Sequence, residues 1–111
     1  MDKIESYQQF ITQILSKHAE LSSGDENVKP QLIFDRENNH YQLAYVGWEG
    51  DKRVFGPMMH FDIIDGKIWI QYNGTEEAVA QTLVDFGVPH SDIVIAFHSR
   101  FKRQFTSYAV D

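Results

Sequence analysis

The sequence predicts one α+β domain, built on a four-stranded antiparallel sheet with helices packed on one face. Three observations support this fold class. An apolar pattern with helical spacing opens the chain, four strand-like segments separated by short turns follow it, and a second helical pattern comes after the fourth strand. The length of 111 residues fits a single domain, residues 1–111, that can fold without disulfides.

The first predicted helix covers the apolar pattern from Ile4 to Leu21. Asp2 can cap its first turn, and Glu5, three positions later, stands where a capping box requires it. The polar run at residues 22–27 predicts the loop that ends this helix.

Four strands are predicted after this loop. They are Gln31–Asp35, His40–Trp48, Arg53–Ile63 and Lys67–Asn73. Asp65-Gly66 is typical of a two-residue hairpin turn, and a four-residue loop is expected between the second and third strands. Pro57 cannot donate to a strand ladder, so it marks an edge position or a bulge.

The second helix is expected to begin at Thr75, which can cap it, with Glu76 and Glu77 in its first turn. Gly87 suits the position just beyond the end of that helix. A fifth apolar segment, Asp92–Phe97, follows and is not assigned to the sheet.

The hairpin turn at Asp65-Gly66 fixes the register of the third and fourth strands. One face of this pair is then entirely apolar, and we expect the helices to pack on it. The cross-strand pairs expected on this face are Ile63 with Ile68, Phe61 with Ile70, and Met59 with Tyr72.

The opposite face of the sheet is predicted to be an interface. It carries Trp69, and the register expected for the preceding hairpin adds four more large side chains. Such a patch is larger than a monomer normally exposes. A homodimer is the first expectation, and a heteromeric partner or the C-terminal segment is the alternative cover. The predicted interface residues are Tyr41, Leu43, Tyr45, Met58 and Trp69.

The composition limits the possible function classes. The sequence has no cysteine, which excludes thiolate metal sites and cysteine nucleophiles. A net charge of −6 argues against a broad nucleic-acid-binding surface, so DNA is expected to bind weakly at most. No signal pattern and no apolar run of membrane-spanning length is evident, which makes the cytoplasm the expected compartment and a membrane an unexpected partner.

Two short motifs could support chemistry, but a structural explanation is favoured for each. Asp65-Gly66-Lys67 has the Asp-x-Lys form of metal-dependent nucleases and could recruit Asp62 or Asp35, yet the same residues suit a tight turn. His60-x-Asp62 places an imidazole and a carboxylate on one strand face, but no third ligand follows at a motif spacing. No catalytic residue, cofactor or metal site is therefore predicted.

The C-terminal segment interleaves cations with aromatic rings. Its candidate contacts for a partner or for nucleic acid are Arg100, Phe101, Lys102 and Arg103. Arginine and aromatic side chains are typical anchors of protein interfaces, and the same mixture can hold single-stranded nucleic acid by stacking and charge. Docking on a protein is favoured, with a structural tail as the second interpretation and nucleic-acid binding as the third.

Several short blocks, which follow one another in order along nearly the whole chain, resemble the XisI family. They are Gln31–Asp35, His40–Leu43, Val46–Trp48, Asp62–Gln71, Asn73–Glu76, Gly87–Pro89, Asp92–Val94, Phe97-His98 and Lys102–Gln104. In one departure, Ser99-Arg100 stands where the family usually has proline.

The resemblance implies an α+β fold and a cyanobacterial protein related to the excision controlling factor of the fdxN element. It implies an accessory, non-enzymatic role in programmed DNA rearrangement, alongside a XisH-like controlling factor and a site-specific recombinase. The family supplies no catalytic residues to carry over. The alternatives are a metal-dependent nuclease subunit that uses Asp62, Asp65 and Lys67, and a weak nucleic-acid-binding module led by the basic segment.

Overall fold

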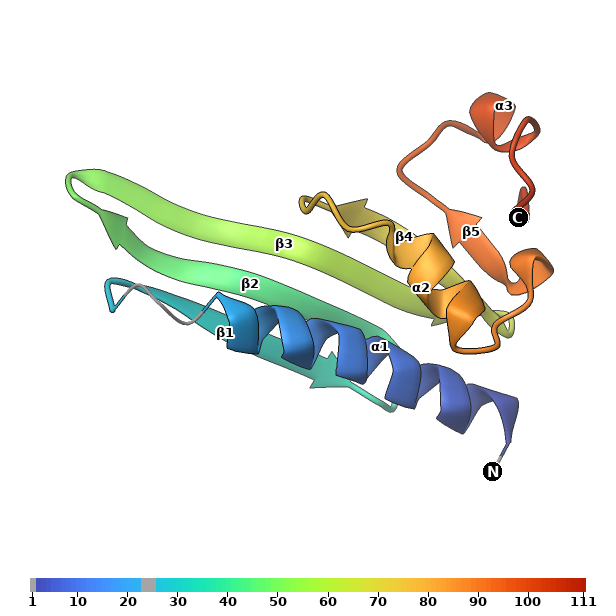
Figure 1. Ribbon diagram of the computed structural model, residues 1–111, viewed down its shortest axis with the longest axis horizontal. Helices are drawn as coiled ribbons and strands as arrows, with labels where there is room; N and C mark the ends of the chain where they lie inside the picture. The colour runs from blue at the N-terminus through green and yellow to red at the C-terminus, as the bar shows by residue number, and fades with distance from the viewer. Residues whose placement is uncertain (1, 23–25) are drawn as a thin grey trace.

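The computed structural model describes residues 2–22 and 26–111 and shows one sheet with two helices beside it (Figure 1). The polar loop predicted at residues 22–27 includes residues 23–25, which lie outside the described residues. In chain order the elements are α1 (Lys3–Leu21), β1 (Val28–Asp35), β2 (His40–Glu49), β3 (Lys52–Ile64), β4 (Lys67–Asn73), α2 (Val79–Asp85), η1 (His90–Asp92), β5 (Ile93–Ile95) and α3 (Arg100–Arg103).

The sheet has five strands in the order β1-β2-β3-β4-β5. The first four are antiparallel to their neighbours, as predicted. The fifth comes from the apolar segment at 92–97 and pairs in parallel with β4, so the sheet is mixed. Parallel pairing is possible because the chain crosses back through α2 between the two strands.

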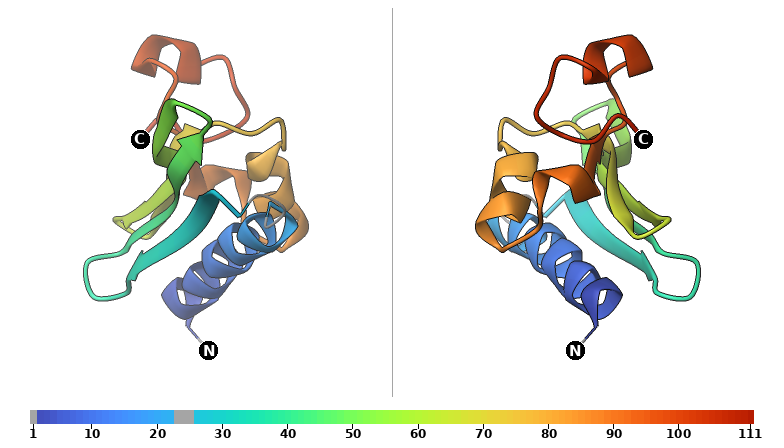
Figure 2. Two further views of the ribbon diagram at one scale, coloured as in Figure 1. Left: turned by 90° about the vertical axis from the view of Figure 1, so that its left-hand side faces the viewer. Right: turned by 90° about the vertical axis from the view of Figure 1, so that its right-hand side faces the viewer.

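The helices α1 and α2 cover one side of the sheet, here named the helix face, and the opposite side is named the open face (Figure 2). The α1 helix begins at its predicted cap, where Asp2 Oδ1 accepts a hydrogen bond of 2.8 Å from the Glu5 amide. The helix α1 contacts β1, β2 and β3, and its buried side chains form one stripe within the core: Tyr7, Ile11, Ile14, Leu15 and Ala19. Among the described residues, no helix has the length and apolar character that crossing a membrane requires.

A β-bulge interrupts the β2–β3 hairpin. The hairpin turn has two residues instead of the predicted four, but the pairing still follows the predicted register as far as Pro57. The next pair is Leu43 with Met59, so Met58 is an extra residue on β3. Pro57 has no N–H to donate to the ladder, and Gly56 before it has φ of 155°, an angle that side chains rarely permit. These two residues favour a bulge at this point.

The bulge directs four of the predicted interface residues towards the helices. Tyr41 lies opposite Phe61, Leu43 lies in the same row, and both are fully buried. Tyr45 and Met58 are half-buried against the same core. The prediction that these four lie on the open face is therefore wrong. Because side chains alternate along a strand, a shift of one residue exchanges the two faces of β2 relative to the end of β3.

A second bulge lies in the β3–β4 pair. The Asp65-Gly66 turn forms as predicted, with φ of 51° and 76°, and fixes the expected pairs next to it. Farther along, His60 lies opposite Tyr72, so Gln71 is an extra residue on β4. The predicted pair of Met59 with Tyr72 is wrong, because the bulge turns the tyrosine to the open face.

The α2 helix begins later than predicted, at Val79, and its N-cap residue is Ala78 without a side-chain hydrogen bond. Thr75 is instead held in a turn by Asn73, whose Oδ1 accepts hydrogen bonds from the Thr75 amide at 3.0 Å and from its hydroxyl at 2.6 Å. The threonine hydroxyl in turn accepts the Glu77 amide at 3.2 Å. The asparagine turn thus uses the residue that sequence reasoning assigned to the helix cap.

Replacing a core residue of β2 tests the corrected register. Leu43→Ala should lower the free energy of unfolding by about 2–5 kcal/mol, because it opens a cavity at a fully buried site. The matched control is Leu21→Ala, because the Leu21 side chain is 74% exposed. This change should alter the free energy of unfolding by less than about 0.5 kcal/mol. Urea unfolding followed by circular dichroism measures both. Equal, small effects would place Leu43 on the open face after all.

Candidate functional site

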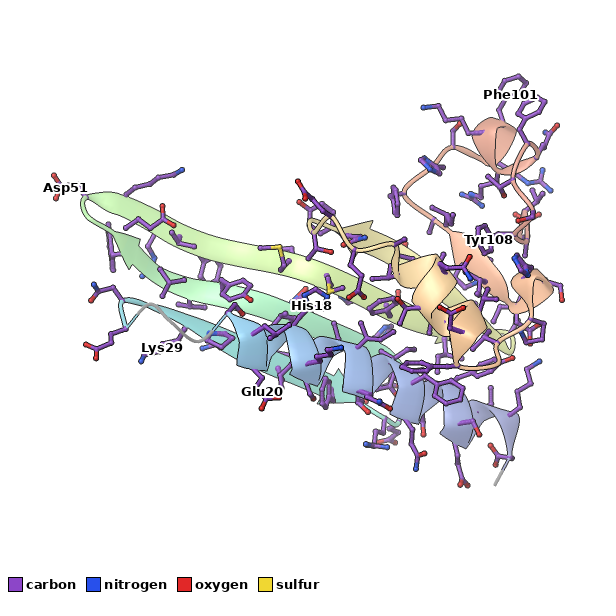
Figure 3. The ribbon with its side chains drawn as sticks, viewed as in Figure 1. His18, Glu20, Lys29, Asp51, Phe101 and Tyr108 are labelled. Atoms are coloured by element: carbon purple, nitrogen blue, oxygen red, sulfur yellow. The ribbon has the colours of Figure 1, made fainter. Side chains whose placement is uncertain are left out.

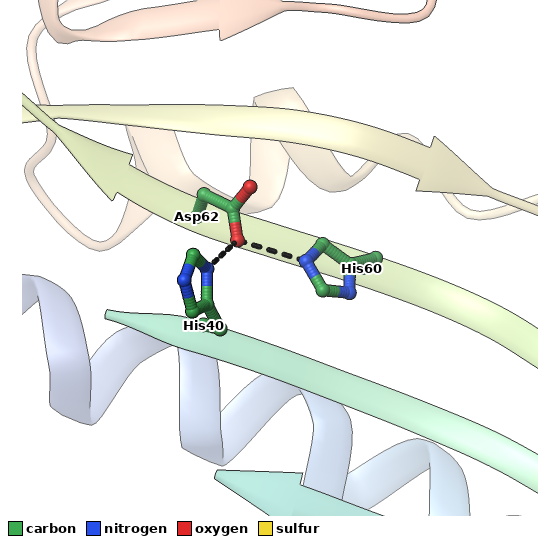
Figure 4. Close-up of side chains that lie close together, drawn as sticks. All are labelled: His40, His60 and Asp62. Carbon is green, nitrogen blue, oxygen red and sulfur yellow. Dashed lines mark hydrogen bonds and ion pairs between the residues drawn. The ribbon is translucent and has the colours of Figure 1, made fainter. Parts of the chain in front are cut away.

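Three titratable side chains come together on the open face near the middle of the sheet (Figure 4). His40 comes from the start of β2, and His60 and Asp62 come from β3. His40 Nδ1 and His60 Nε2 each lie 2.8 Å from Asp62 Oδ1. The side chain of Asp62 is only 12% exposed, whereas that of His40 is 57% exposed. We name these residues the His-His-Asp cluster.

Strand pairing and the second bulge build this cluster. His40 lies opposite Asp62 in the β2–β3 ladder, and His60 is two residues away from Asp62 on the same face of β3. The extra residue of the second bulge, Gln71, donates a hydrogen bond of 3.1 Å from Nε2 to the other oxygen of Asp62. On the far side of His60, its Nδ1 lies 3.4 Å from Gln42 Oε1. Bulges often redirect side chains beside functional sites in this way.

The contacts in the cluster shift two pKa values in opposite directions. Burial raises the pKa of Asp62, but its hydrogen bonds with His40, His60 and Gln71 outweigh burial, so the pKa lies below its ordinary value. The hydrogen bond to Asp62 and the charge of that carboxylate raise the pKa of His40. The pair therefore contributes fully to stability between the ordinary values of the two groups, from about pH 4 to about pH 6.5. This contribution is lost as the pH rises through the raised pKa of His40, or falls through the lowered pKa of Asp62.

Sequence reasoning identified two members of the cluster and missed the third. His60-x-Asp62 was visible as a motif, but His40 is twenty residues earlier and follows no motif spacing. The available signal was the pairing of the second and third strands, which places His40 opposite Asp62 once the bulge is included. The three residues each offer a ligand atom, and these atoms lie within 4.8 Å of one another.

The residues proposed for a nuclease alternative do not converge. The Asp62 carboxylate is directed to the two histidines and Gln71. Asp65 is exposed in the hairpin turn, and Lys67 Nζ donates a hydrogen bond to the backbone oxygen of Asp111. The geometry that would place a carboxylate pair and a lysine around one metal and one water is thus not formed by these groups.

The C-terminal residues cover one end of the open face. The Arg103 guanidinium lies 5.5 Å from the centre of the Trp69 ring, and Val94 beside Trp69 bridges to Ala109. Trp69 is the one predicted interface residue that lies on the open face, and this contact leaves it half-buried. The C-terminal segment is therefore a cover within the same chain for this end of the face.

The predicted contact residues of the C-terminal segment divide into two groups. Arg100 forms an ion pair of 2.6 Å with Asp111, and Arg103 donates to the backbone oxygen of Val110 at 2.7 Å, so both hold the chain end in place. Phe101 and Lys102 remain exposed, and Figure 3 shows Phe101 projecting outwards from α3. Only the second group is free to meet a partner without breaking these internal contacts.

An aromatic patch lies at the other end of the open face. Trp48 and Phe55 are 50% and 74% exposed. The guanidinium of Arg53 lies 5.2 Å from the Trp48 ring and 5.7 Å from the Phe55 ring, measured to the ring centres. These residues lie on the part of the β2–β3 hairpin that extends beyond the helices (Figure 1). We name them the hairpin patch.

Comparisons with known proteins agree with this architecture. The family model described as XisI protein matches residues 1–110. A crystal structure of a XisI-like protein from Anabaena variabilis shares 44% sequence identity with a TM-score of 0.92, covering 97% of this chain and 99% of the other. A crystal structure of the fdxN element excision controlling factor XisI from Anabaena variabilis shares 34% identity with a TM-score of 0.87, covering 99% and 100%. The comparison with curated proteins gave no match.

Removing the charge at the centre of the cluster should change the titration of His40. In Asp62→Asn, we expect the His40 midpoint to fall from its raised value towards the ordinary value of about 6.5, because the carboxylate that stabilises the imidazolium is lost. Histidine proton shifts measured by NMR as a function of pH report this midpoint. Asp111→Asn, a matched change at the Arg100 pair, should leave it unchanged. A His40 midpoint that is the same in both variants would contradict the assigned contact.

Proposed function

We propose, because this chain belongs to the XisI family, that it is an accessory regulatory protein that acts in the cytoplasm, through protein contacts, in programmed DNA rearrangement. The similarity to the fdxN element excision controlling factor supports the biological setting of this proposal. The name of that protein describes control of excision, which suggests regulation more than catalysis.

The observation that carries the proposal is the hairpin patch. Its exposed rings and the arginine between them have the composition of interface hot spots, in which tryptophan and arginine dominate. The arginine is already held by the two rings and by a hydrogen bond of 3.3 Å to the Gly47 backbone oxygen, so little side-chain freedom remains to be lost on docking. The patch lies on the part of the hairpin that extends beyond the helices, where a partner can reach it.

Charge indicates which partner suits the patch. The chain carries a net charge of −6, so a second copy is repelled at long range, whereas a basic protein is attracted. Direct DNA binding is disfavoured for the same reason, and two of the three C-terminal cations hold the chain end. The family resemblance suggests a XisH-like controlling factor as the occupant of the patch, with a site-specific recombinase further along the assembly. A homodimer through the same surface is the second candidate.

Mixing this chain with a purified XisH-like protein tests the proposal. Size-exclusion chromatography with light scattering should show a complex, and Trp48→Asp or Phe55→Asp should weaken it at least about tenfold, because a buried charge replaces an anchor ring. Leu21→Asp is the matched control, since Leu21 is as exposed as Phe55 but lies at the end of α1. The absence of a wild-type complex would contradict the partner, and an equal effect of all variants would contradict the patch. The mass in solution of this chain without a partner, measured by the same method, shows whether it forms a homodimer.

The nuclease alternative is tested separately. The purified chain should leave plasmid and linear DNA uncut in the presence of Mg²⁺ or Mn²⁺, because Asp62 and Lys67 are held by different groups and Asp65 is exposed in the hairpin turn. Gel electrophoresis of the DNA is the measurement. If metal-dependent cleavage appears, disappears in Asp65→Ala and Lys67→Ala, and persists in the control Asp51→Ala, the chain is a nuclease and the accessory role is wrong.

A further inference from the structure

Both ring nitrogens of His60 have polar partners in and beside the His-His-Asp cluster. A neutral imidazole has one N–H donor and one acceptor nitrogen. Both nitrogens of His60 face oxygens, since Nε2 lies 2.8 Å from Asp62 Oδ1 and Nδ1 lies 3.4 Å from Gln42 Oε1. A neutral His60 can donate to only one of them. The nitrogen that carries no proton is available to bind a metal ion, while the other donates its N–H.

We propose that the His-His-Asp cluster binds a divalent transition-metal ion of the Zn²⁺ class. With a metal ion held by His60 Nε2 and Asp62 Oδ1, His60 keeps its proton on Nδ1, which faces Gln42 Oε1. Histidines that bind metals almost always donate their other N–H to an oxygen in this way. Gln71, which hydrogen-bonds the second oxygen of Asp62, orients the carboxylate ligand in the same manner.

The spacing of the ligand atoms suits such an ion. Metal bonds of about 2.0–2.1 Å to nitrogen and to oxygen require ligand atoms about 3–3.4 Å apart. Both histidine nitrogens now lie 2.8 Å from Asp62 Oδ1, and all three atoms lie within 4.8 Å of one another. Small rotations of the two histidine rings are sufficient to reach this spacing. The ring of His40 is mostly exposed and therefore free to rotate.

The ligand types decide the class of metal. Two imidazoles and one carboxylate favour zinc and its first-row neighbours, whereas Mg²⁺ and Ca²⁺ prefer sites made of oxygen alone. The sequence has no cysteine to compete for the ion. Three protein ligands also leave at least one coordination position free. This position faces outwards from the open face, where a water molecule or a side chain of a partner can fill it.

The structure around the cluster is prepared for this role. Asp62 is the one charged residue that is buried in the described part of the chain, yet it lies on the face away from the helices. One bulge lies at Met58 on the same strand as Asp62, and the other lies at Gln71 on the neighbouring strand β4. The bulge at Met58 brings His40 opposite Asp62, and the bulge at Gln71 brings that side chain to the second oxygen of Asp62, so both bulges help to form the cluster.

The test is Zn²⁺ binding to the untagged protein after treatment with a chelator, measured by isothermal titration calorimetry. One ion per chain is expected, with binding about tenfold to 100-fold weaker in His40→Gln, His60→Gln and Asp62→Asn. His98→Gln is the matched control, because that histidine contacts Phe97 and not the cluster. Mg²⁺ should not bind. Co²⁺ in place of zinc should give visible absorption bands whose loss in His40→Gln shows that this ring is a ligand.

Three outcomes would overturn the proposal. One is no saturable zinc uptake by the wild-type chain, and another is uptake by His40→Gln and Asp62→Asn that equals the wild type. The third is an equal loss of uptake in His98→Gln, which would indicate scattered binding by surface histidines. Circular dichroism confirms that each variant is folded, and His40→Gln decides the result if Asp62→Asn is unstable, because the His40 side chain is mostly exposed.

Discussion

Pro57 has no N–H to give to the β2–β3 ladder, and the extra residue beside it, Met58, moves every later pair by one position. The rest of the structure depends on this shift. It directs Tyr41 and Leu43 into the core beneath α1, where both are fully buried. It also brings His40 opposite Asp62, so the same bulge completes the core on one face and the cluster on the other.

The open face then has three regions that are used differently. The C-terminal residues cover the β4–β5 end, where Arg103 lies on Trp69. The His-His-Asp cluster occupies the middle, with its central carboxylate buried. The hairpin patch at the opposite end remains exposed, with Arg53 between two rings. The hairpin patch and the His-His-Asp cluster lie at separate positions along β2 and β3, so they are tested independently.

Local signals in the sequence predicted what depends on neighbouring residues. The cap at Asp2, the hairpin turn at Asp65-Gly66 and the approximate positions of four strands follow from short-range patterns, and the structure confirms them. The fifth strand could not be predicted in this way, because parallel pairing joins segments that lie far apart in the chain. Pro57 signalled a bulge, but the sequence does not show which residue is extra. Without that information, the faces of β2 and the third member of the cluster could not be assigned.

Nuclear Overhauser effects between backbone protons of β2 and β3 test the shifted register of these two strands directly. We expect cross-strand contacts of Leu43 with Met59 and of Tyr41 with Phe61. The same spectra would contradict this expectation if Leu43 instead contacted Met58 across the ladder and Tyr41 contacted His60. That register would return the side chains of β2 to the open face and separate His40 from Asp62.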